Sequence, residues 1–438
     1  MRKILSGRRG SGRGPFQMIV NTAITTQYGS QPPSGTNQFY FPIAASTDTQ
    51  GYSINFDIDW GDGTTSSINS TNFATACLHT YASPGTYTIS AEGNIAAFNF
   101  WNSATNGKSD GNKLLEITRW GDLKMTGGAT GTAGQIFRQC GKLTTISAPD
   151  TPWFTPDTFG LTNTRGGRAT FANCTNLVII NNIANWDVSA LSSIEIMFSG
   201  CSKFQFGTNA SGPIDLSGWD VSRVTQFERM FFMNWAFNGT MFSNVGANTT
   251  STNIDMEKMF YWCLKFDNNF SQTMNSWDTS GVSNMSQMFQ NAIIFNDKIT
   301  SWDTSNVTTM NSMFSSANAF NQSIGGWNTG NVVDMRNMFT DASNFDKDIS
   351  GWNVNAWNVS TVGSSPMTGP TGTFNLSTSN YDALLLAWDN NYSFPSWPGG
   401  TVDFGSSQYS LTSPGNSVAN ARASLVTKWG TLNDGGGV

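Results

Sequence analysis

Apolar residues recur at a long, fixed interval in the middle of the chain. Trp277, Trp302, Trp327 and Trp352 lie 25 residues apart, and a Met-Phe pair follows the first three of them eleven residues later. Aligning the chain on this pair gives about eight units of roughly 25–34 residues, which is typical of a solenoid whose units bury their apolar faces against one another. The aligned residues are Phe137, Phe171, Phe198, Phe231, Phe260, Phe289, Phe314 and Phe339.

Residues 302–327 indicate how one unit folds. Asp303 and Ser305 have short polar side chains that bond to nearby backbone groups, which is typical of a turn. Residues 307–310 are expected to form a short strand that pairs with the same stretch of the next unit. The apolar residues that follow have helical spacing and predict a helical or 3₁₀ turn with one apolar face: Met310, Met313, Phe314, Ala317 and Phe320. We therefore predict that the recurring Trp and Met-Phe residues are stacked core residues rather than parts of a cofactor or ligand cage.

Residues 54–93 lie before the repeats and alternate apolar and polar positions. Asp57 and Asp59 are expected to face outward from the first strand, and the apolar residues to face inward: Ile54, Phe56, Ile58 and Trp60. Asp62-Gly63 and Pro84-Gly85 are typical of tight turns. The pattern predicts consecutive β-hairpins.

Residues 376–436 follow the repeats and have a different pattern. Two stretches approximate the spacing of amphipathic helices, and their apolar residues are Tyr381, Leu384, Leu385 and Trp388, then Ala419, Ala421, Leu425 and Trp429. A terminal unit with its own pattern is what a repeat array needs to shield its last hydrophobic face. We predict a C-terminal cap.

Three segments resemble known families. The pattern of Trp, Met-Phe and Phe-Asn residues between about 130 and 360 resembles the BspA-like leucine-rich-repeat family of bacterial surface proteins and of some phage proteins. Residues 376–436 resemble the segment that commonly closes such arrays. The stretches "WGDG" and "HTYASPGTYT" within residues 41–93 resemble the polycystic-kidney-disease (PKD) type of immunoglobulin-like sandwich, which is usually a spacer or adhesion module.

The resemblances imply a mainly β protein. They imply an immunoglobulin-like β-sandwich of the PKD type, then a leucine-rich-repeat-like solenoid of about eight coils and a C-terminal α/β cap. The expected boundaries are 1–40 for a basic arm and linker, 41–118 for the sandwich, 119–372 for the solenoid and 373–438 for the cap.

Charge is sparse and unevenly distributed. Charged residues make up 12% of the chain and the net charge is −6, yet no acidic residue precedes Asp48. A basic arm on an acidic body can dock on an acidic partner, on nucleic acid or on a neighbouring copy of the body, and a solvated tail is the structural alternative. We predict an anchor that contacts other proteins rather than nucleic acid, made by Arg2, Lys3, Arg8, Arg9 and Arg13.

A second candidate contact lies near the C-terminus. Residues 390–400 place Tyr392, Phe394 and Trp397 in a stretch rich in Pro and Gly. Aromatic side chains with a polar group suit contacts with proteins or sugars. The alternative is that these rings pack on the helices of the cap.

Cysteines occupy one position of the repeat. Cys140, Cys174, Cys201 and Cys263 each lie three residues after the aligned Phe, where other units have Ala292, Ala317 and Ala342. A small apolar side chain is therefore expected there, although stacked neighbours such as Cys174 and Cys201 leave a disulfide open. Cys77 lies outside the repeats, and no CxxC pair indicates zinc.

The acidic residues and the single histidine give no catalytic pattern. The repeated acids after Trp, such as Asp278 and Asp303, are interpreted as turn-formers rather than a ladder of catalytic carboxylates. The stretch "DIDWGDG" resembles a calcium loop, but Gly61 replaces a ligand and no Glu follows at the twelfth position. His79 has no adjacent nucleophile. We predict no catalytic residue, metal or cofactor.

The expected function is a non-enzymatic virion surface protein of a bacteriophage. It would be a decoration of the capsid exterior or a tail or fibre component, acting in structural attachment and in host or surface adhesion. The start "MRKILSGRRG" lacks the apolar stretch of a secretory signal, and virions leave by lysis. Its partners would be other virion proteins in an oligomeric assembly, and a protein or glycan of the host surface, with no membrane insertion.

Two alternatives stay open. One is a bacterial cell-surface adhesin exported without a recognisable Sec signal, located on the cell surface or outside the cell. The other is a polysaccharide-degrading enzyme on a repeat scaffold, which needs two carboxylates roughly 5–10 Å apart in a groove.

Overall fold

The structure is a computed structural model that describes residues 12–27, 32–45, 53–100, 110–125, 134–154, 167–205, 213–247, 253–268, 273–356, 375–391 and 400–438. It is mainly β, with few helices. The chain divides into two compact units. The first comprises Met1–Gln226 and Met230–Phe242, and the second comprises Phe227–Arg229 and Ser243–Val438. The units are described separately below.

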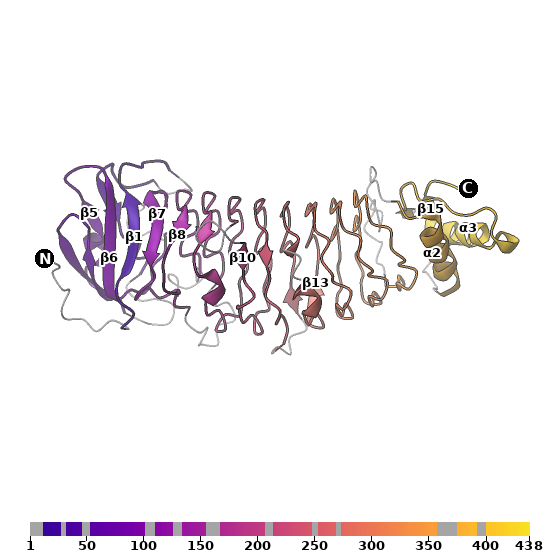
Figure 1. Cartoon of the computed structure of the whole chain (residues 1–438), viewed down its shortest axis with the longest axis horizontal. Coiled ribbons are helices and arrows are strands. Elements are labelled where there is room, and N and C mark those ends of the chain that lie inside the picture. Colours follow the sequence, from indigo (N-terminus) through magenta and orange to yellow (C-terminus); the bar gives the residue numbers. More distant parts are fainter. Residues whose placement is uncertain are drawn as a thin grey trace. The chain divides into compact units, whose positions relative to one another are not determined.

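A seven-stranded sheet dominates the first unit (Figure 1). Its order is β4-β3-β6-β1-β7-β8-β9, antiparallel from β4 to β7 and parallel from β7 to β9. The strands are β1 (Phe16–Asn21), β3 (Asn55–Asp59), β4 (Thr65–Asn69), β6 (Thr86–Asn94), β7 (Leu114–Arg119), β8 (Thr145–Ile146) and β9 (Ile179–Ile180). A second sheet pairs β2 (Gln38–Tyr40) with β5 (Leu78–Thr80), next to the short helix α1 (Phe73–Ala76).

The alternation read from the sequence is confirmed in this sheet. Ile54, Phe56, Ile58 and Trp60 are buried, whereas Asp57 and Asp59 are partly exposed. β1 shows the same alternation, with every second residue from Phe16 buried, and it lies between β6 and β7. β1 is therefore a central strand of the sheet, although it lies within residues 1–40, which were expected to form a basic arm and linker.

The same sheet continues into the first repeats. β8 and β9 each begin eight residues after an aligned Phe, and β8 pairs in parallel with both β7 and β9. The ring of Phe137 lies 5.7 Å from that of Phe98 and 5.9 Å from that of Trp120. The antiparallel sheet and the first repeats consequently share one hydrophobic core, and the sheet covers the first turn of the array.

Aromatic rings stack from turn to turn in both units. In the first unit the rings of Phe137, Phe171, Phe198 and Phe231 follow one another at 5.5, 5.6 and 5.8 Å. In the second, those of Phe260, Phe289, Phe314 and Phe339 do so at 5.6, 5.7 and 5.9 Å. All are fully buried, so the prediction that these residues stack in the core is confirmed.

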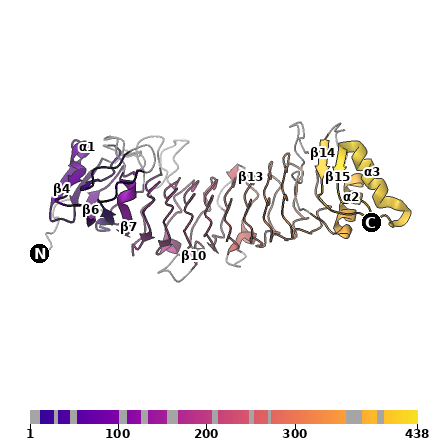
Figure 2. The same ribbon diagram turned by 90° about the horizontal axis from the view of Figure 1, so that it is seen from above.

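Backbone hydrogen bonds join successive turns through alternate residues. The N–H groups of Met310, Ser312, Phe314 and Ser316 donate to carbonyl oxygens of residues 334, 336, 338 and 340 in the next turn. The residues between them close tight turns within their own repeat, as Met313 N–H does on Met310 O at 3.1 Å. The expected strand pairing also occurs, because Thr309 bridges in parallel to Asn284 and Asp334. Figures 1 and 2 show these turns side by side within each unit.

The single helical or 3₁₀ turn expected after residue 310 is not formed. The chain makes a series of separate tight turns there instead. Ser312 and Ser316 have φ of 52° and 58°, so the third residue of the turn 310–313 and that of the turn 314–317 are left-handed. Successive turns closed by i→i−3 bonds also place apolar residues at three- and four-residue spacing, which is why the pattern imitates a helix. The same two positions are left-handed in other repeats, for example Gln287 with Asn291 and Asn337 with Asp341.

Short elements complete the repeats. The first unit contains η1 (Gly111–Lys113), η2 (Ile183–Asn185) and the parallel pair β10 (Ile214–Asp215) and β11 (Gly239–Thr240). The second contains η4 (Thr273–Ser276) and the parallel pair β12 (Ile254–Asp255) and β13 (Val282–Asn284).

Two α-helices, a 3₁₀ helix and two strands form the C-terminal part of the second unit (Figure 2). They are α2 (Thr378–Asn391), β14 (Gly400–Asp403), η5 (Pro414–Asn416), α3 (Ser417–Trp429) and β15 (Gly430–Asn433). The expected helical faces are buried except at Ala419, which is partly exposed while Val418 is buried in its place. Trp388 of α2 lies against Trp429 of α3 at 6.1 Å. Before α2, Ser377 donates its N–H and hydroxyl to Asp346 (2.8 and 2.9 Å), which ties α2 to the last described repeat.

Candidate functional site

The predicted anchor is described only at its end. Arg2, Lys3, Arg8 and Arg9 lie outside the described residues. The Arg13 guanidinium donates to the carbonyl oxygens of Gly121 (3.2 Å) and Thr151, and it lies over the ring of Trp153. Arg119 donates in turn to Arg13 O at 3.0 Å. Arg13 is therefore held by its own chain, and it fixes the point at which the arm joins the first unit.

The predicted aromatic contact loop also falls outside the described residues. Tyr392, Phe394 and Trp397 lie between the end of α2 at Asn391 and the start of β14 at Gly400. Their role stays a prediction.

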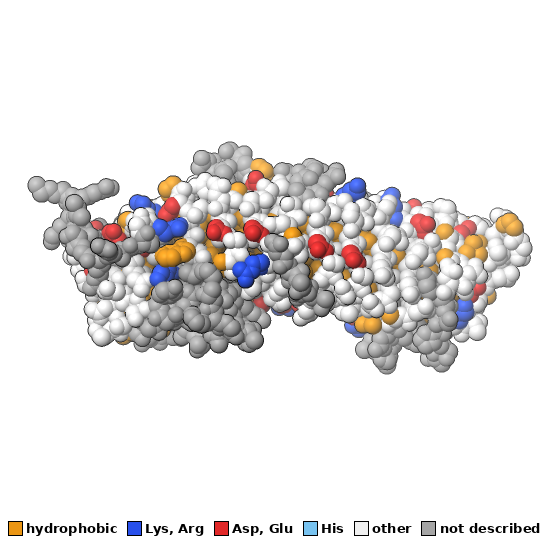
Figure 3. All heavy atoms as spheres, turned by 90° about the horizontal axis from the view of Figure 1, so that it is seen from below, with side chains coloured by type: hydrophobic (Ala, Val, Ile, Leu, Met, Phe, Trp, Pro, Cys, Tyr) orange, Lys and Arg blue, Asp and Glu red, His pale blue; other side chains and the backbone are white. Residues whose placement is uncertain are grey.

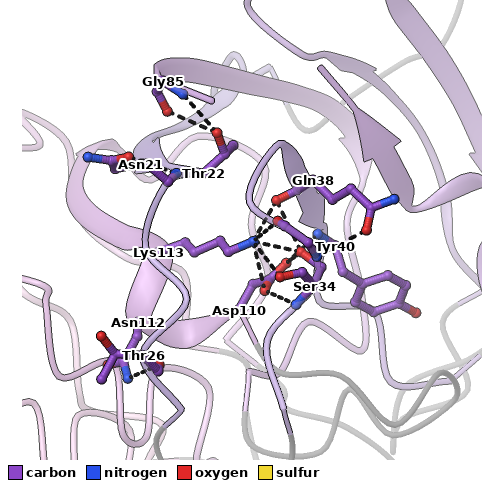
Figure 4. A network of polar contacts seen from close by, with 12 residues as sticks. Asn21, Thr22, Thr26, Ser34, Gln38, Tyr40, Gly85, Asp110, Asn112 and Lys113 are labelled. Atoms are coloured by element: carbon purple, nitrogen blue, oxygen red, sulfur yellow. Dashed lines mark hydrogen bonds and ion pairs between the residues drawn. The ribbon is translucent and has the colours of Figure 1, made fainter. Parts of the chain in front are cut away.

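A lysine and an aspartate are buried together in the first unit (Figure 4). Lys113 Nζ lies 3.5 Å from Asp110 Oδ1, and both side chains are fully buried. The ammonium donates to Ser34 Oγ (2.8 Å) and to the carbonyl oxygens of Ser34 (3.2 Å), Gly35 (2.8 Å) and Gln38 (2.7 Å). Burial lowers the pKa of Lys113 more than Asp110 raises it.

The carboxylate of Asp110 is equally well satisfied. It accepts the N–H groups of Ser34 (2.8 Å) and Tyr40 (2.7 Å) and the Ser34 hydroxyl (2.6 Å). A buried ion pair with all its hydrogen bonds made is costly to break from one side. The pair therefore joins the segment before β2 to η1, and it positions β2 rather than offering a reactive group to solvent.

His79 and Asp62 meet beside an aromatic stack. His79 Nε2 lies 2.8 Å from Asp62 Oδ2, and its ring stacks on Trp60 at 4.7 Å. Thr64 donates its N–H and hydroxyl to Asp62 Oδ1 (3.0 and 2.6 Å). Burial favours the protonated acid, but these hydrogen bonds outweigh it and lower the pKa of Asp62. Oδ1 is thus engaged by Thr64 of the same hairpin, which joins β3 and β4, and Oδ2 is engaged by His79 of β5.

The repeated acidic and amide residues after Trp are turn-formers, as predicted. Asp303 Oδ1 accepts the N–H of Ser305 at 2.8 Å, and Asn328 Oδ1 accepts that of Gly330 at 3.1 Å. The same contact is made by Asp187, Asp220, Asp278 and Asn353. Each oxygen therefore stabilises a turn two residues ahead.

The cysteines are small core residues, as predicted. All five are free and buried. Cys174 and Cys201 donate through Sγ to the carbonyl oxygens of Phe137 and Phe171, each at 3.1 Å. Burial raises the pKa of Cys201 to about 12 and those of Cys140 and Cys174 well above the usual value. Thiols in this state are poor nucleophiles.

A row of ion pairs lies two and three residues before the aligned Phe. Arg229 Nη1 lies 2.5 Å from Glu228 and its Nη2 lies 3.5 Å from Glu257, which also contacts Lys258. Arg168 and Glu195 pair in the first unit at 3.2 Å. The face in Figure 3 is mainly uncharged, with acidic and basic side chains in small groups. Paired charges of this kind contribute little to stability.

Large apolar side chains are exposed just after the aligned Phe. In the second unit Trp262, Ile293 and Ile294 are 37%, 40% and 42% exposed. In the first unit Met233 and Trp235 are 39% and 48% exposed. Trp262 and Met233 occupy the same repeat position, two residues after Phe, and both are left-handed. These residues are the strongest candidates for a contact surface.

Sequence reasoning missed this surface because it aligned the repeats only by their core. The alignment does carry a signal. In other repeats the position two residues after Phe holds a small or polar residue: Asn173, Gly200, Asn291, Ser316 or Asp341. A Trp or Met there is therefore unusual for the repeat, and the core does not require it.

Within the described ranges, no group of three or more His, Cys, Asp or Glu residues is arranged to hold a metal ion. No helix in those ranges is long and apolar enough to cross a membrane.

The comparisons with known proteins identify one similarity. Residues 166–272 and 265–381 match the family described as "Mycoplasma protein of unknown function, DUF285". Both matched ranges fall largely on the repeats. No curated protein and no solved structure matches the chain.

Proposed function

We propose that this chain is a non-enzymatic virion surface protein of a bacteriophage, either a decoration of the capsid exterior or a tail or fibre component. It would act in attachment to the particle and in adhesion to a host or other surface. In this proposal the repeats are a leucine-rich-repeat-like solenoid of the BspA type. The antiparallel strands are a PKD-type sandwich, and α2 to β15 form the cap.

The observation that carries the adhesive role is the exposure of large apolar side chains at outward positions of the repeats. Trp262 and Ile293 follow buried core residues within one or two positions. The stacked Phe and Trp residues and the turn-forming acids already account for the stability of a repeat. An additional Trp that leaves 37% of its side chain exposed favours a contact with another molecule.

Attachment to a particle is supported by the first unit. Arg13 is fixed against Gly121 and Thr151, so the four basic residues before it join the body at a defined point. Several charge-assisted contacts together can hold a subunit on an acidic lattice.

The alternative is a bacterial cell-surface adhesin. The similarity to a family described from Mycoplasma, which is a cellular organism, favours this reading. Mass spectrometry of purified virions and of host envelope fractions separates the two. Enrichment in virions supports the proposal, and enrichment in the envelope alone contradicts it.

Truncation tests the anchor. Removal of residues 1–11 keeps Arg13 and is expected to leave both units folded while abolishing incorporation into the parent particle. Arg13→Ala is the matched control, because it removes contacts within the chain and should lower stability without preventing incorporation. Normal incorporation of the truncated protein would rule out the anchor.

A further inference from the structure

Trp262 combines an unfavourable backbone with an exposed side chain. Its φ is 58°, and its side chain is 37% exposed. A left-handed backbone brings Cβ close to the following carbonyl oxygen, so a bulky residue is disfavoured there. Asn291 and Ser316 occupy the same position in the next two repeats and have nearly the same φ, 61° and 58°.

The indole is not needed for the turn. The contact between turns at this position is made by the backbone, as Trp262 N–H donates to Gln290 O at 2.8 Å. Asn291 makes the equivalent bond to Ser315 O at 2.8 Å without any ring. Strained residues retained without a structural benefit are typical of functional sites.

The surroundings of the indole combine apolar surface with neutral hydrogen-bonding groups. The ring of Tyr261 lies 6.5 Å from that of Trp262 at 37°. The next turn presents the amides of Gln290 and Asn291, both partly exposed, and Gln287 donates to Gln290 Oε1 at 2.7 Å. Lys258, four residues before Trp262, is paired with Glu257, so these two charges offset one another.

We propose that Trp262 is the stacking platform of a binding site for a neutral sugar ring of a glycan. The C–H face of a pyranose stacks on the indole, and the amides of Gln290 and Asn291 bond its hydroxyl groups. An uncharged, polar ligand fits the neutral amides of Gln290 and Asn291, and a flat ring explains why an aromatic residue stands at a strained position. The inference rests on the proposed adhesive role and holds for either a virion or a cell-surface location.

Saturation-transfer NMR and calorimetry on the full chain test the site. The probes are maltohexaose, cellohexaose, chitohexaose and mannohexaose. At least one is expected to bind, and Trp262→Asn is expected to weaken it about tenfold or more. The melting temperature of this variant should equal or exceed that of the wild type, because Asn tolerates a left-handed backbone. Lost binding in a protein that melts lower would indicate damage to the fold instead.

Two further substitutions separate a sugar platform from a protein-docking surface. Trp262→Phe keeps a flat aromatic face and should bind within about threefold of the wild type, whereas Trp262→Leu keeps only apolar area and should lose binding. Val333→Asn removes an exposed apolar side chain from another repeat position and should have no effect. Full binding by Trp262→Leu would overturn the stacking role. Failure of all four probes would overturn the sugar site, even where virion fractions contain the protein.

Discussion

The two units use the same repeat but differ in how completely they satisfy its buried polar groups. In the second unit the indoles of Trp302, Trp327 and Trp352 each donate to a carbonyl oxygen of the preceding turn, at 2.7, 3.3 and 3.0 Å. In the first unit Trp219 does the same at 2.7 Å. The indole N–H of Trp186 there is buried and has no hydrogen-bond partner within the part of the chain that is described.

A second difference concerns the small core position three residues after Phe. The second unit fills it with small side chains only, Cys263, Ala292, Ala317 and Ala342, all fully buried. The first unit has cysteines there and, in one repeat, Asn234, whose amide is fully buried without a partner among described atoms. Where the repeats have the same length, each buried donor lies beside an equivalent acceptor in the neighbouring turn. Inserts in the first unit change which partners a buried group can reach.

The largest effect is expected from the regular stack. Trp302→Ala removes a ring that lies between Trp277 and Trp327 (5.8 and 6.1 Å) and should cost about 3–5 kcal/mol. Because each turn rests on its neighbours, calorimetric melting should also broaden or split. Trp235→Ala removes an exposed Trp and is the matched control, with an expected change within about 0.5 kcal/mol. Equal melting of the two variants would mean that the stack does not stabilise the second unit.

The next effect tests whether the first unit depends on a buried pair. Lys113→Met leaves the Asp110 carboxylate buried without its ammonium, and such losses cost about 3–5 kcal/mol. Three donors remain on Asp110, so the lower end, about 3 kcal/mol, is expected from urea unfolding. Adding Asp110→Asn should recover part of the loss, since it removes the uncompensated charge. Additive destabilisation by the two changes would contradict a coupled pair.

A smaller effect of opposite sign is expected at Asn234. Asn234→Ala removes a buried amide without a partner and places there the residue that the second unit uses, so stability should rise by about 1 kcal/mol. Cys201→Ala is the control at the same repeat position and should lower stability slightly, because it loses a buried sulfur and its contact with Phe171 O. Thermal unfolding of both variants measures the comparison. A destabilised Asn234→Ala would show that the amide is satisfied in solution.

These differences also mark what the sequence could predict. Stacked residues such as Phe314 and turn-formers such as Asp303 were predictable, because their contacts recur at a fixed sequence distance. The left-handed residues were not predictable, because a serine such as Ser312 or Ser316 does not by itself indicate a left-handed backbone and because the apolar spacing imitates a helix. The exposed Trp262 was overlooked because the repeats were aligned only by their core residues.

Contacts between distant segments were also beyond the sequence. Lys113 and Asp110 contact β2 and the segment before it across 70 to 79 residues, and neither residue belongs to a motif. β1 shows the two-residue alternation, but it stands alone between polar segments, so only its pairing with β6 and β7 identifies it as a central strand. The strands of the hairpins near Trp60 were predictable, because turn signals and alternation occur together there.

The smallest expected effect concerns the end of the second unit. Asn296, Asn321 and Asp346 form a row in which each side-chain oxygen accepts the N–H of the equivalent residue in the next segment, ending at Ser377. Burial favours protonated Asp346, but the hydrogen bonds from Ser377 and Asn380 outweigh it and hold the pKa of Asp346 below its usual value.

The sign of the pH dependence follows from that shift. The folded-state pKa is below the unfolded value of about 3.9, so ionised Asp346 contributes stability that is fully present above the unfolded pKa. The contribution is lost as pH falls through the folded-state pKa. Asp346→Asn keeps an acceptor, as Asn321 shows, but cannot ionise. The melting temperatures of wild type and variant should therefore differ at pH 6 and converge as pH falls from about 4 towards 2. Because Asp346 is partly exposed, solvent screens its charge and the difference should be small. A difference that stays constant with pH would mean that the amide-like geometry of the row, and not the charge, holds α2 to the last described repeat.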